Sequence, residues 1–170
     1  SKTTGQYRLG FSWINRSLTG NRDTLSLMPV WSKGTASGSF AYSVPVKDGG
    51  QLAISYDKNR ISILSGSYAH LNIEGYSSDL GLSYSWPQSV RLGFKSEHSF
   101  QLHSKNSETL FDGSKILDTD VKTAVYGYTL QANSNKKAVY VRHDVARGYG
   151  DSIGQRQHFI KYSLSAVRQQ

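Results

Sequence analysis

The sequence lacks cysteine and carries little charge. None of the 170 residues is cysteine, and 19% of them are charged. Without cysteine the chain has no disulfide bond, no thiolate nucleophile and no cysteine-bound zinc. It also has no run of about 18 apolar residues, so the sequence predicts no membrane-spanning helix. Strands can cross a membrane without such a run, because their side chains alternate between two faces.

Small neutral polar residues take the place of the missing charge. Soluble domains carry about 25% charged residues, whereas Ser and Gly are abundant here and Tyr provides 11 of the aromatic residues. Hydrophobic residues make up only 37% of the chain, so a larger apolar core does not compensate. The length suits one ordinary domain.

The net charge of +8 does not predict binding to nucleic acid. Lys33, Lys47, Lys58 and the Lys136-Lys137 pair fall at or near expected turns, and no basic stripe alternates with stacking aromatic residues. Positive turns suit anionic lipid headgroups or lipopolysaccharide instead. We therefore expect no nucleic-acid partner.

Alternation of apolar and polar residues is the dominant pattern, and it predicts an all-β, antiparallel protein. In the longest run, 90–104, Phe94 and Leu102 share one face, while Ser96 and His98 interrupt the apolar row. No helical periodicity competes. The runs give about nine strands, at 7–13, 25–31, 40–46, 52–56, 80–86, 90–104, 124–130, 139–145 and 160–166.

Turn residues separate the expected strands. Asp48-Gly49-Gly50 predicts a hairpin, as do Pro87-Gln88-Ser89 and Asn133-Ser134-Asn135-Lys136. Three less regular segments are richer in Gly, Ser, Asn and Asp, and we expect longer connections or frayed strand ends there: 59–78, 104–120 and 146–157.

The polar side of the expected sheet favours a barrel around water. In a soluble sandwich the outward face carries Lys, Glu, Arg and Thr, whereas Ser, Gly, Thr and Gln predominate here. Several runs reach roughly the 9 to 11 residues that cross a bilayer. We therefore expect a transmembrane β-barrel in the outer membrane of a Gram-negative bacterium, with its apolar rows against lipid.

Aromatic residues close several apolar rows, as in the girdles at the two surfaces of a bilayer. Trp13, Trp31 and Trp86 each lie at an expected strand end. The alternative is that they are core aromatics of a soluble sheet. The expected lipid-facing aromatic residues are Tyr7, Phe11, Trp13, Trp31, Tyr84, Trp86, Tyr126, Tyr128 and Tyr162.

Charged residues on the polar faces are candidates for the wall of the barrel lumen. They could line a conduit for cargo, or pair across strands and hold the barrel in shape, and the sequence leaves both roles open. The candidates are Arg8, Arg91, Lys95, Glu97, Lys122, Arg142, Asp144 and Lys161.

No histidine spacing predicts catalysis or metal binding. His98 and His103 fall on opposite faces of a strand. His143-Asp144 with a distant Ser152 could only be forced into a hydrolase triad, because there is no G-x-S-x-G elbow. We expect no enzyme activity, no metal, no cofactor and no small-molecule substrate.

Four stretches look like the barrel of a known family. Segment 15–27, Asn-Arg-Ser-Leu-Thr-Gly-Asn-Arg-Asp-Thr-Leu-Ser-Leu, is similar to the first-hairpin pattern Asn-Pro-x-Gly-x-Gly-Asp-x-Leu, with Arg16 replacing Pro and Asn21-Arg22 replacing the second Gly. Segments 4–10, 43–50 and 81–87 resemble the first strand, the next hairpin, and the fifth strand with its turn. Together they resemble the two-partner secretion transporters, the haemolysin secretion and activation branch of the Omp85 superfamily.

This resemblance implies a barrel of about sixteen strands that passes a secreted exoprotein of haemolysin or adhesin type to the cell surface. In that family, POTRA modules before the barrel capture the unfolded partner. Because the chain opens without Met or a signal peptide, we expect residues 1–170 to be a partial barrel domain, its N-terminal half, without POTRA modules or the later strands. Ala146-Arg147-Gly148-Tyr149 mimics the family's Val-Arg-Gly-Tyr/Phe lumen element, but it follows only the eighth expected strand, so no role is transferred to it.

Two other functions stay open. A complete outer-membrane barrel of about eight strands, with a structural or adhesive role, would close by itself. Such proteins end on an aromatic residue, whereas this chain stops at Val167-Arg168-Gln169-Gln170. A soluble β-sandwich binding module would instead pack the bulky rows in a dry interior.

Overall fold

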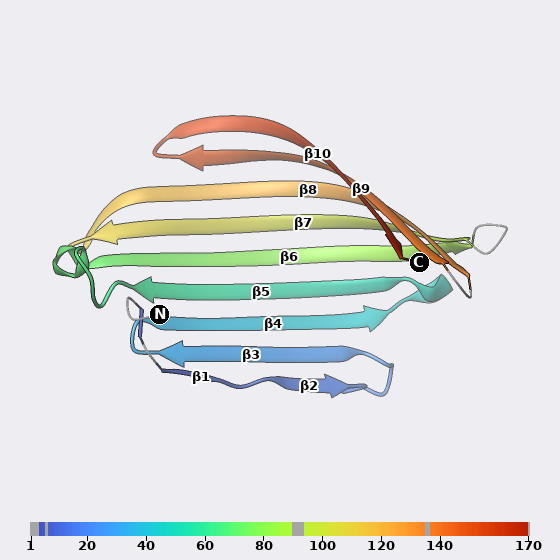
Figure 1. The fold of residues 1–170 in the computed structure, drawn as a ribbon, viewed down its shortest axis with the longest axis horizontal. Coiled ribbons are helices and arrows are strands. Elements are labelled where there is room, and N and C mark those ends of the chain that lie inside the picture. Colours follow the sequence, from blue (N-terminus) through green and yellow to red (C-terminus); the bar gives the residue numbers. More distant parts are fainter. Residues whose placement is uncertain (1–3, 6, 90–93, 135–136, 170) are drawn as a thin grey trace.

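The chain folds into one antiparallel β-sheet (Figure 1). The computed structural model describes residues 4–5, 7–89, 94–134 and 137–169. Neighbours in the sheet follow chain order from β3 to β10, and β1 and β2 both pair with β3. The strands are β1 (Arg8–Gly10), β2 (Trp13–Arg16), β3 (Thr24–Ser32), β4 (Thr35–Pro45), β5 (Gln51–Ser62), β6 (Ile73–Ser89), β7 (Phe94–Phe111), β8 (Ser114–Ser134), β9 (Lys137–Ser152) and β10 (Gln155–Gln169), with short 3-10 helices η1 (Lys47–Gly49) and η2 (Ala69–Leu71).

The sheet is curved and open. In Figure 1, β9 and β10 bend across the right-hand ends of the middle strands, while β1 and β2 form the opposite edge. Within the described residues the two edges do not pair with each other. This arrangement does not match the alternative of a small barrel that closes on its own strands.

All nine expected strands are present, and the differences lie at their ends. The expected strand 7–13 is part of an edge strand in two pieces, β1 and β2. Both pieces pair with β3 in the same register. Residues 87–89, expected to turn, instead continue β6, where Pro87 lies opposite Glu97. Proline is tolerated there because β5 begins only at Gln51, opposite Ser85, so β5 does not pair with Pro87. Residues 90–93, expected to begin the next strand, lie outside the described residues.

Two of the segments expected to be longer connections or frayed strand ends are instead paired strand ends joined by tight turns. Residues 104–120 form the facing ends of β7 and β8, joined by Asp112 (φ 46°) and Gly113 (φ 77°). Residues 146–157 likewise join β9 to β10 through Ile153 (φ 51°) and Gly154 (φ 76°). Two consecutive residues with positive φ form the turn whose twist matches that of the flanking strands. The expectation for 59–78 is right only for its centre, since β5 ends at Ser62 and β6 begins at Ile73.

The sheet has two chemically different faces. Residues directly opposite one another in an antiparallel pair point to the same side, so a row can be followed across the strands. One row on β6–β10 defines what we call the apolar face: Tyr84, Phe100, Tyr126, Val145 and Tyr162. The next row defines the polar face: Ser83, Gln101, Val125, Ala146 and Lys161.

The sheet has no hydrophobic core. Among the residues that the structure describes, no hydrophobic side chain is buried, and Leu82, Phe100 and Tyr126 are 46%, 43% and 40% exposed in the middle of the sheet. A soluble sandwich would cover such rows with a second layer. The single layer therefore contradicts the alternative of a soluble sandwich, and its apolar face requires a membrane or another protein against it.

Glycines let larger side chains cross the polar face close to the backbone. A Cβ atom on Gly148 would lie 2.6 Å from the ring of Phe159, which is directly opposite on β10, and 2.7 Å from the carbonyl oxygen of Lys122. A Cβ on Gly127 would lie 2.6 Å from Asp144. The polar face is thus crowded at these points, and glycine is required for the observed packing.

We predict that Gly148→Ala destabilises the sheet by about 1–3 kcal/mol, because the new methyl group meets backbone as well as a ring. Urea unfolding of the full-length protein in vesicles, followed by tryptophan fluorescence, measures this change. Gly38→Ala is the matched control, since nothing lies within 4 Å of its added Cβ. Equal losses of stability in the two variants would contradict the packing argument.

Candidate functional site: the two faces of the sheet

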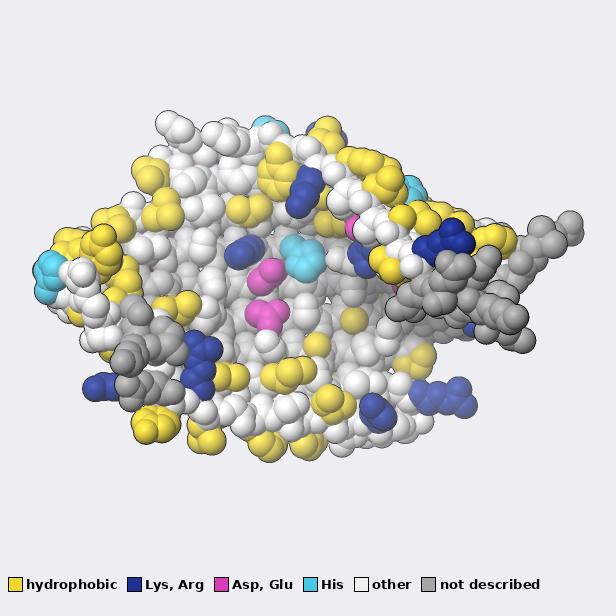
Figure 2. Space-filling model, in the orientation of Figure 1, with side chains coloured by type: hydrophobic (Ala, Val, Ile, Leu, Met, Phe, Trp, Pro, Cys, Tyr) yellow, Lys and Arg dark blue, Asp and Glu magenta, His cyan; other side chains and the backbone are white. Residues whose placement is uncertain are grey.

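The polar face is concave and lined mainly by small neutral side chains. Figure 2 looks at this face, where most of the surface is white and a few charged and histidine side chains lie near the centre. Serine and glycine recur along it, as where Ser55 lies opposite Gly81 and Ser99 opposite Gly127. Such side chains bind water without carrying charge, so the surface suits a water-filled space.

Charged side chains meet at the centre of the polar face. Asp57 and Asp79 lie directly opposite each other on β5 and β6, an unfavourable pairing for like charges. Partners offset it: the Ser39 hydroxyl donates to Asp57, and Nδ1 of His103 lies 3.2 Å from a carboxylate oxygen of Asp79. Lys105 lies opposite Asp79 on β7. Sequence reasoning missed this cluster, because only the register joins positions so far apart in the chain.

A second charged pair lies on the polar face of β9. Nε of Arg142 donates to both carboxylate oxygens of Asp144, at 3.1 and 3.0 Å. The two residues are two apart in a strand and so share a face. Because both side chains keep access to solvent, such a pair contributes only ~0.2–1 kcal/mol. Its main effect is to neutralise two charges on this face.

The register places most of the predicted lumen residues on the polar face. Those found there are Arg8, Lys95, Glu97, Arg142, Asp144 and Lys161. The prediction for Lys122 is wrong: it lies opposite Ser104 and Tyr149, on the apolar face with Ala124, because residues two apart in a strand point the same way. Arg91 lies outside the described residues. That these residues line a lumen stays a prediction.

A ladder of aromatic rings crosses the apolar face. Four rings on β6–β9 lie directly opposite one another: Trp86, His98, Tyr128 and His143. Successive ring centroids are 5.3, 4.9 and 5.3 Å apart. His98, which interrupts the apolar row in the sequence, belongs to this ladder, and its two ring nitrogens lie 2.6 Å from the Tyr126 hydroxyl and 3.0 Å from Gln88. Rings with satisfied polar atoms suit the boundary between lipid tails and headgroups.

The predicted girdle residues within strands lie on the apolar face. They are Trp13, Trp31, Tyr84, Trp86, Tyr126, Tyr128 and Tyr162. Phe11 continues the same edge strand, where its N–H donates to the carbonyl of Pro29. Trp13 and Trp86 do not close their strands, since β2 continues to Arg16 and β6 to Ser89. Tyr7 precedes β1 with 87% of its surface exposed. Contact with lipid stays a prediction.

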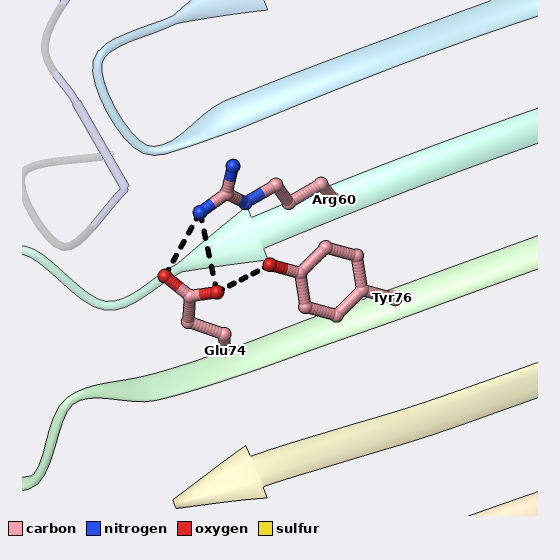
Figure 3. Close-up of polar contacts among 3 residues, drawn as sticks. All are labelled: Arg60, Glu74 and Tyr76. Atoms are coloured by element: carbon pink, nitrogen blue, oxygen red, sulfur yellow. Dashed lines mark hydrogen bonds and ion pairs between the residues drawn. The ribbon is translucent and has the colours of Figure 1, made fainter. Parts of the chain in front are cut away.

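The apolar face becomes charged toward one end of the sheet. There the guanidinium of Arg60 lies 3.0 and 3.2 Å from the two carboxylate oxygens of Glu74, and the Tyr76 hydroxyl donates to the same carboxylate (Figure 3). On β7 and β8, Nζ of Lys115 lies 2.8 Å from Glu108. The apolar residues therefore form a band and do not cover the whole face.

The border of this band runs across β5 to β9 and shifts by no more than one row between neighbouring strands. The last apolar residues before it are Tyr56, Leu80, Leu102, Ala124 and Val145. Two positions further on, the same face carries Lys58, Ser78, Ser104, Lys122 and Arg147. An apolar band between an aromatic ladder and a charged end is the pattern of a strand surface that meets a hydrocarbon layer.

The described residues bring together no metal centre. No group of three or more metal-ligating side chains occurs among them. His143 faces the apolar side with Tyr128, whereas Asp144 faces the polar side, so the two do not form a catalytic pair. Separately, no helix in the described part of the chain is long and apolar enough to cross a membrane.

A buried carboxylate closes the loop between β2 and β3. Asp23 has no exposed surface, and it accepts hydrogen bonds from the backbone N–H and the hydroxyl of Thr19, each at 3.0 Å. Burial by itself would raise the pKa of Asp23, but the bonds from Thr19 and from the Tyr42 hydroxyl outweigh it, so this pKa lies below its usual value. In the sequence, Asp23 is only one residue of segment 15–27, and no pattern there predicts its role.

We predict that Asp23→Asn opens this loop at neutral pH. Since the folded pKa is lowered, the stabilisation is complete above the unfolded value of about 3.9 and disappears as the pH falls through the folded value. Amide exchange of residues 17–24, corrected for intrinsic rates, should be faster in the variant at pH about 7, and the difference should vanish in stronger acid. Asp48→Asn, in a tight turn with φ 62°, is the control. A difference that persists in acid would contradict the role of the carboxylate.

The comparisons with known proteins concern the fold. No protein-family model matches the sequence, and no curated protein matches it. Among solved structures, the chain is similar to CdiB from Acinetobacter baumannii, with a TM-score of 0.71 and 16% identity over 96% of this chain and 36% of CdiB. The chain therefore spans about a third of the length of that protein, as the 36% coverage shows. It has the fold of part of the CdiB β-barrel, and the predicted fold class is confirmed.

Proposed function

We propose that this chain is the N-terminal half of an outer-membrane barrel that exports a partner protein by two-partner secretion. The observation that carries the proposal is a single-layered sheet with an apolar band on one face and a wall of Ser, Thr and Gly on the other. The fold of CdiB, a two-partner secretion transporter, supports the same function. The partner would be a secreted exoprotein of haemolysin or adhesin type.

The lengths of the strands fit a bilayer. A tilted strand needs about 9–11 residues to cross, and β5 to β10 have between 12 and 21. Within the band, backbone groups are paired in the sheet, as hydrocarbon requires. The outer membrane of a Gram-negative bacterium, with its lipid and lipopolysaccharide, is the environment that we propose.

The chemistry of the polar face suits a moving polypeptide. A conduit must bind its cargo weakly enough to release it. Here Arg142 is paired with Asp144 and Asp79 with His103, so part of the fixed charge is paired within the wall. Between them, hydroxyls and glycines offer weak hydrogen bonds, so an extended chain can slide along this face.

The two free edges of the sheet support a longer barrel. Edge strands expose unpaired backbone groups, which are unstable in a membrane. On the proposal, further strands of the same barrel pair with the β1 and β2 edge and with the edge of β10. A structural or adhesive barrel limited to these ten strands would leave both edges open.

We predict that single cysteines report the two faces in a bilayer. Ser83 and Leu82 are neighbours on β6 that point to opposite faces, and this chain contains no cysteine of its own. In an otherwise cysteine-free full-length protein in vesicles, a water-soluble maleimide should label Ser83→Cys and spare Leu82→Cys. A lipid-borne quencher should show the reverse preference for a fluorophore at these sites. Equal labelling of the two positions would contradict a barrel in a membrane.

We predict that deleting the whole gene removes one large exoprotein from the surface and medium of the source bacterium. The native protein should restore it. Ser83→Trp combined with Ser99→Trp, which adds bulk to the polar face, should insert normally and restore little export. Leu82→Trp combined with Phe100→Trp, at neighbouring positions on the apolar face, should restore it fully. Unchanged secretion after deletion would contradict the proposed function, and equal export by both double variants would contradict passage along the polar face.

A further inference from the structure

A groove of about 560 Å³ lies on the apolar face, at the border of the apolar band. Leu80 and Leu82 of β6 line one side, and Tyr149 of β9 lines the other. The strands between them contribute the short side chains of Ser104 and Ala124, which leave the space open. A groove of this volume lies within the range of sites that hold small ligands.

Three basic side chains surround the end of this groove that faces the charged part of the sheet. Lys122 lies opposite Tyr149, which lies opposite His158, and Arg147 lies opposite Ala124 one row away. Nζ of Lys122 is 6.0 Å from the centre of the Tyr149 ring, and the His158 ring is 6.1 Å from it. The cations of Lys122 and Arg156, 6.0 and 5.7 Å from the centre of the ring, therefore flank a single phenol ring, and Arg156 lies opposite Asp151 on β9.

Lys122 and Arg147 differ from the cations of the sheet that form ion pairs. Within the described residues, Arg60, Lys115 and Arg142 each form an ion pair with a carboxylate, whereas Lys122 and Arg147 form none. Asp120 and Asp151 lie opposite each other on the same face. They form the row that follows Lys122 and Tyr149, further from the apolar band. Positive charge without a counterion thus lies directly beside apolar walls.

We infer that this groove binds one anionic phospholipid, with an acyl chain along the leucines and the phosphate at Lys122 and Arg147. Basic pockets at the level of lipid headgroups recognise anionic lipids in this way. A single groove with two permanent cations fits a phospholipid with one phosphate better than lipid A, which has several chains and two phosphates. The inference rests on the proposed function only for the presence of the sheet in a membrane.

The test uses the full-length protein in nanodiscs of phosphatidylcholine with a minority of phosphatidylglycerol, transferred to mild detergent for native mass spectrometry. The wild type should retain one phosphatidylglycerol in preference to phosphatidylcholine. Lys122→Gln combined with Arg147→Gln should lower this preference by about fivefold for each cation removed. Lys33→Gln combined with Lys58→Gln loses the same charge outside the groove and should behave as wild type. Ala124→Trp, which fills the groove without changing charge, should abolish the retained lipid.

The outcomes separate this inference from the proposed function. Insertion is measured in the same discs by the labelling of Ser83→Cys and Leu82→Cys, so failure to insert counts against the barrel itself. If the protein inserts but retains the two phospholipids equally, or if the Lys122 and Arg147 variant matches the wild type, the lipid site is overturned. Displacement of phosphatidylglycerol by added lipid A would also overturn the assignment to a phospholipid.

Discussion

The alternation of side chains along paired strands is the constraint on which the rest of this structure depends. Once each strand is hydrogen-bonded to its neighbours, every residue must point to one of two faces, and residues two apart share a face. Leu80, Leu82 and Tyr84 can then meet one environment while Gly81 and Ser83 meet another. No second layer is needed, and none is present among the described residues. A sheet of this kind is stable only where its two sides face different surroundings.

Charge is distributed in keeping with that constraint. On the polar face, some opposite charges are joined locally, as in Arg142 with Asp144, and small hydroxyls make the rest of the wall hydrophilic. On the apolar face, most charged groups lie toward one end, where Arg60 and Glu74 form an ion pair beyond the band, and Arg168 lies at the other end. Lys122 and Arg147, which form no ion pair with a described residue, lie at the border of the band.

Several sequence-based expectations held because they depend on local pattern alone. The nine runs of alternation became strands, and His98 and His103 took opposite faces as their spacing required. The expected connections at 104–120 and 146–157 failed because their polar residues are those of strands that are polar on both faces, not of loops. Asp112-Gly113 in the sequence indicates the hairpin between β7 and β8, since such a pair favours the turn with two positive φ angles.

The sequence by itself determined which residues share a face, because the period of two is a property of each strand. Only the tertiary structure decided which residues of different strands meet, because that depends on the register and the order of pairing. The ladder that includes Trp86 and His98, the opposed pair Asp57 and Asp79, and the surroundings of Lys122 all arise in this way. Their partners lie far apart in the chain, and hydrogen bonds between strands place them side by side.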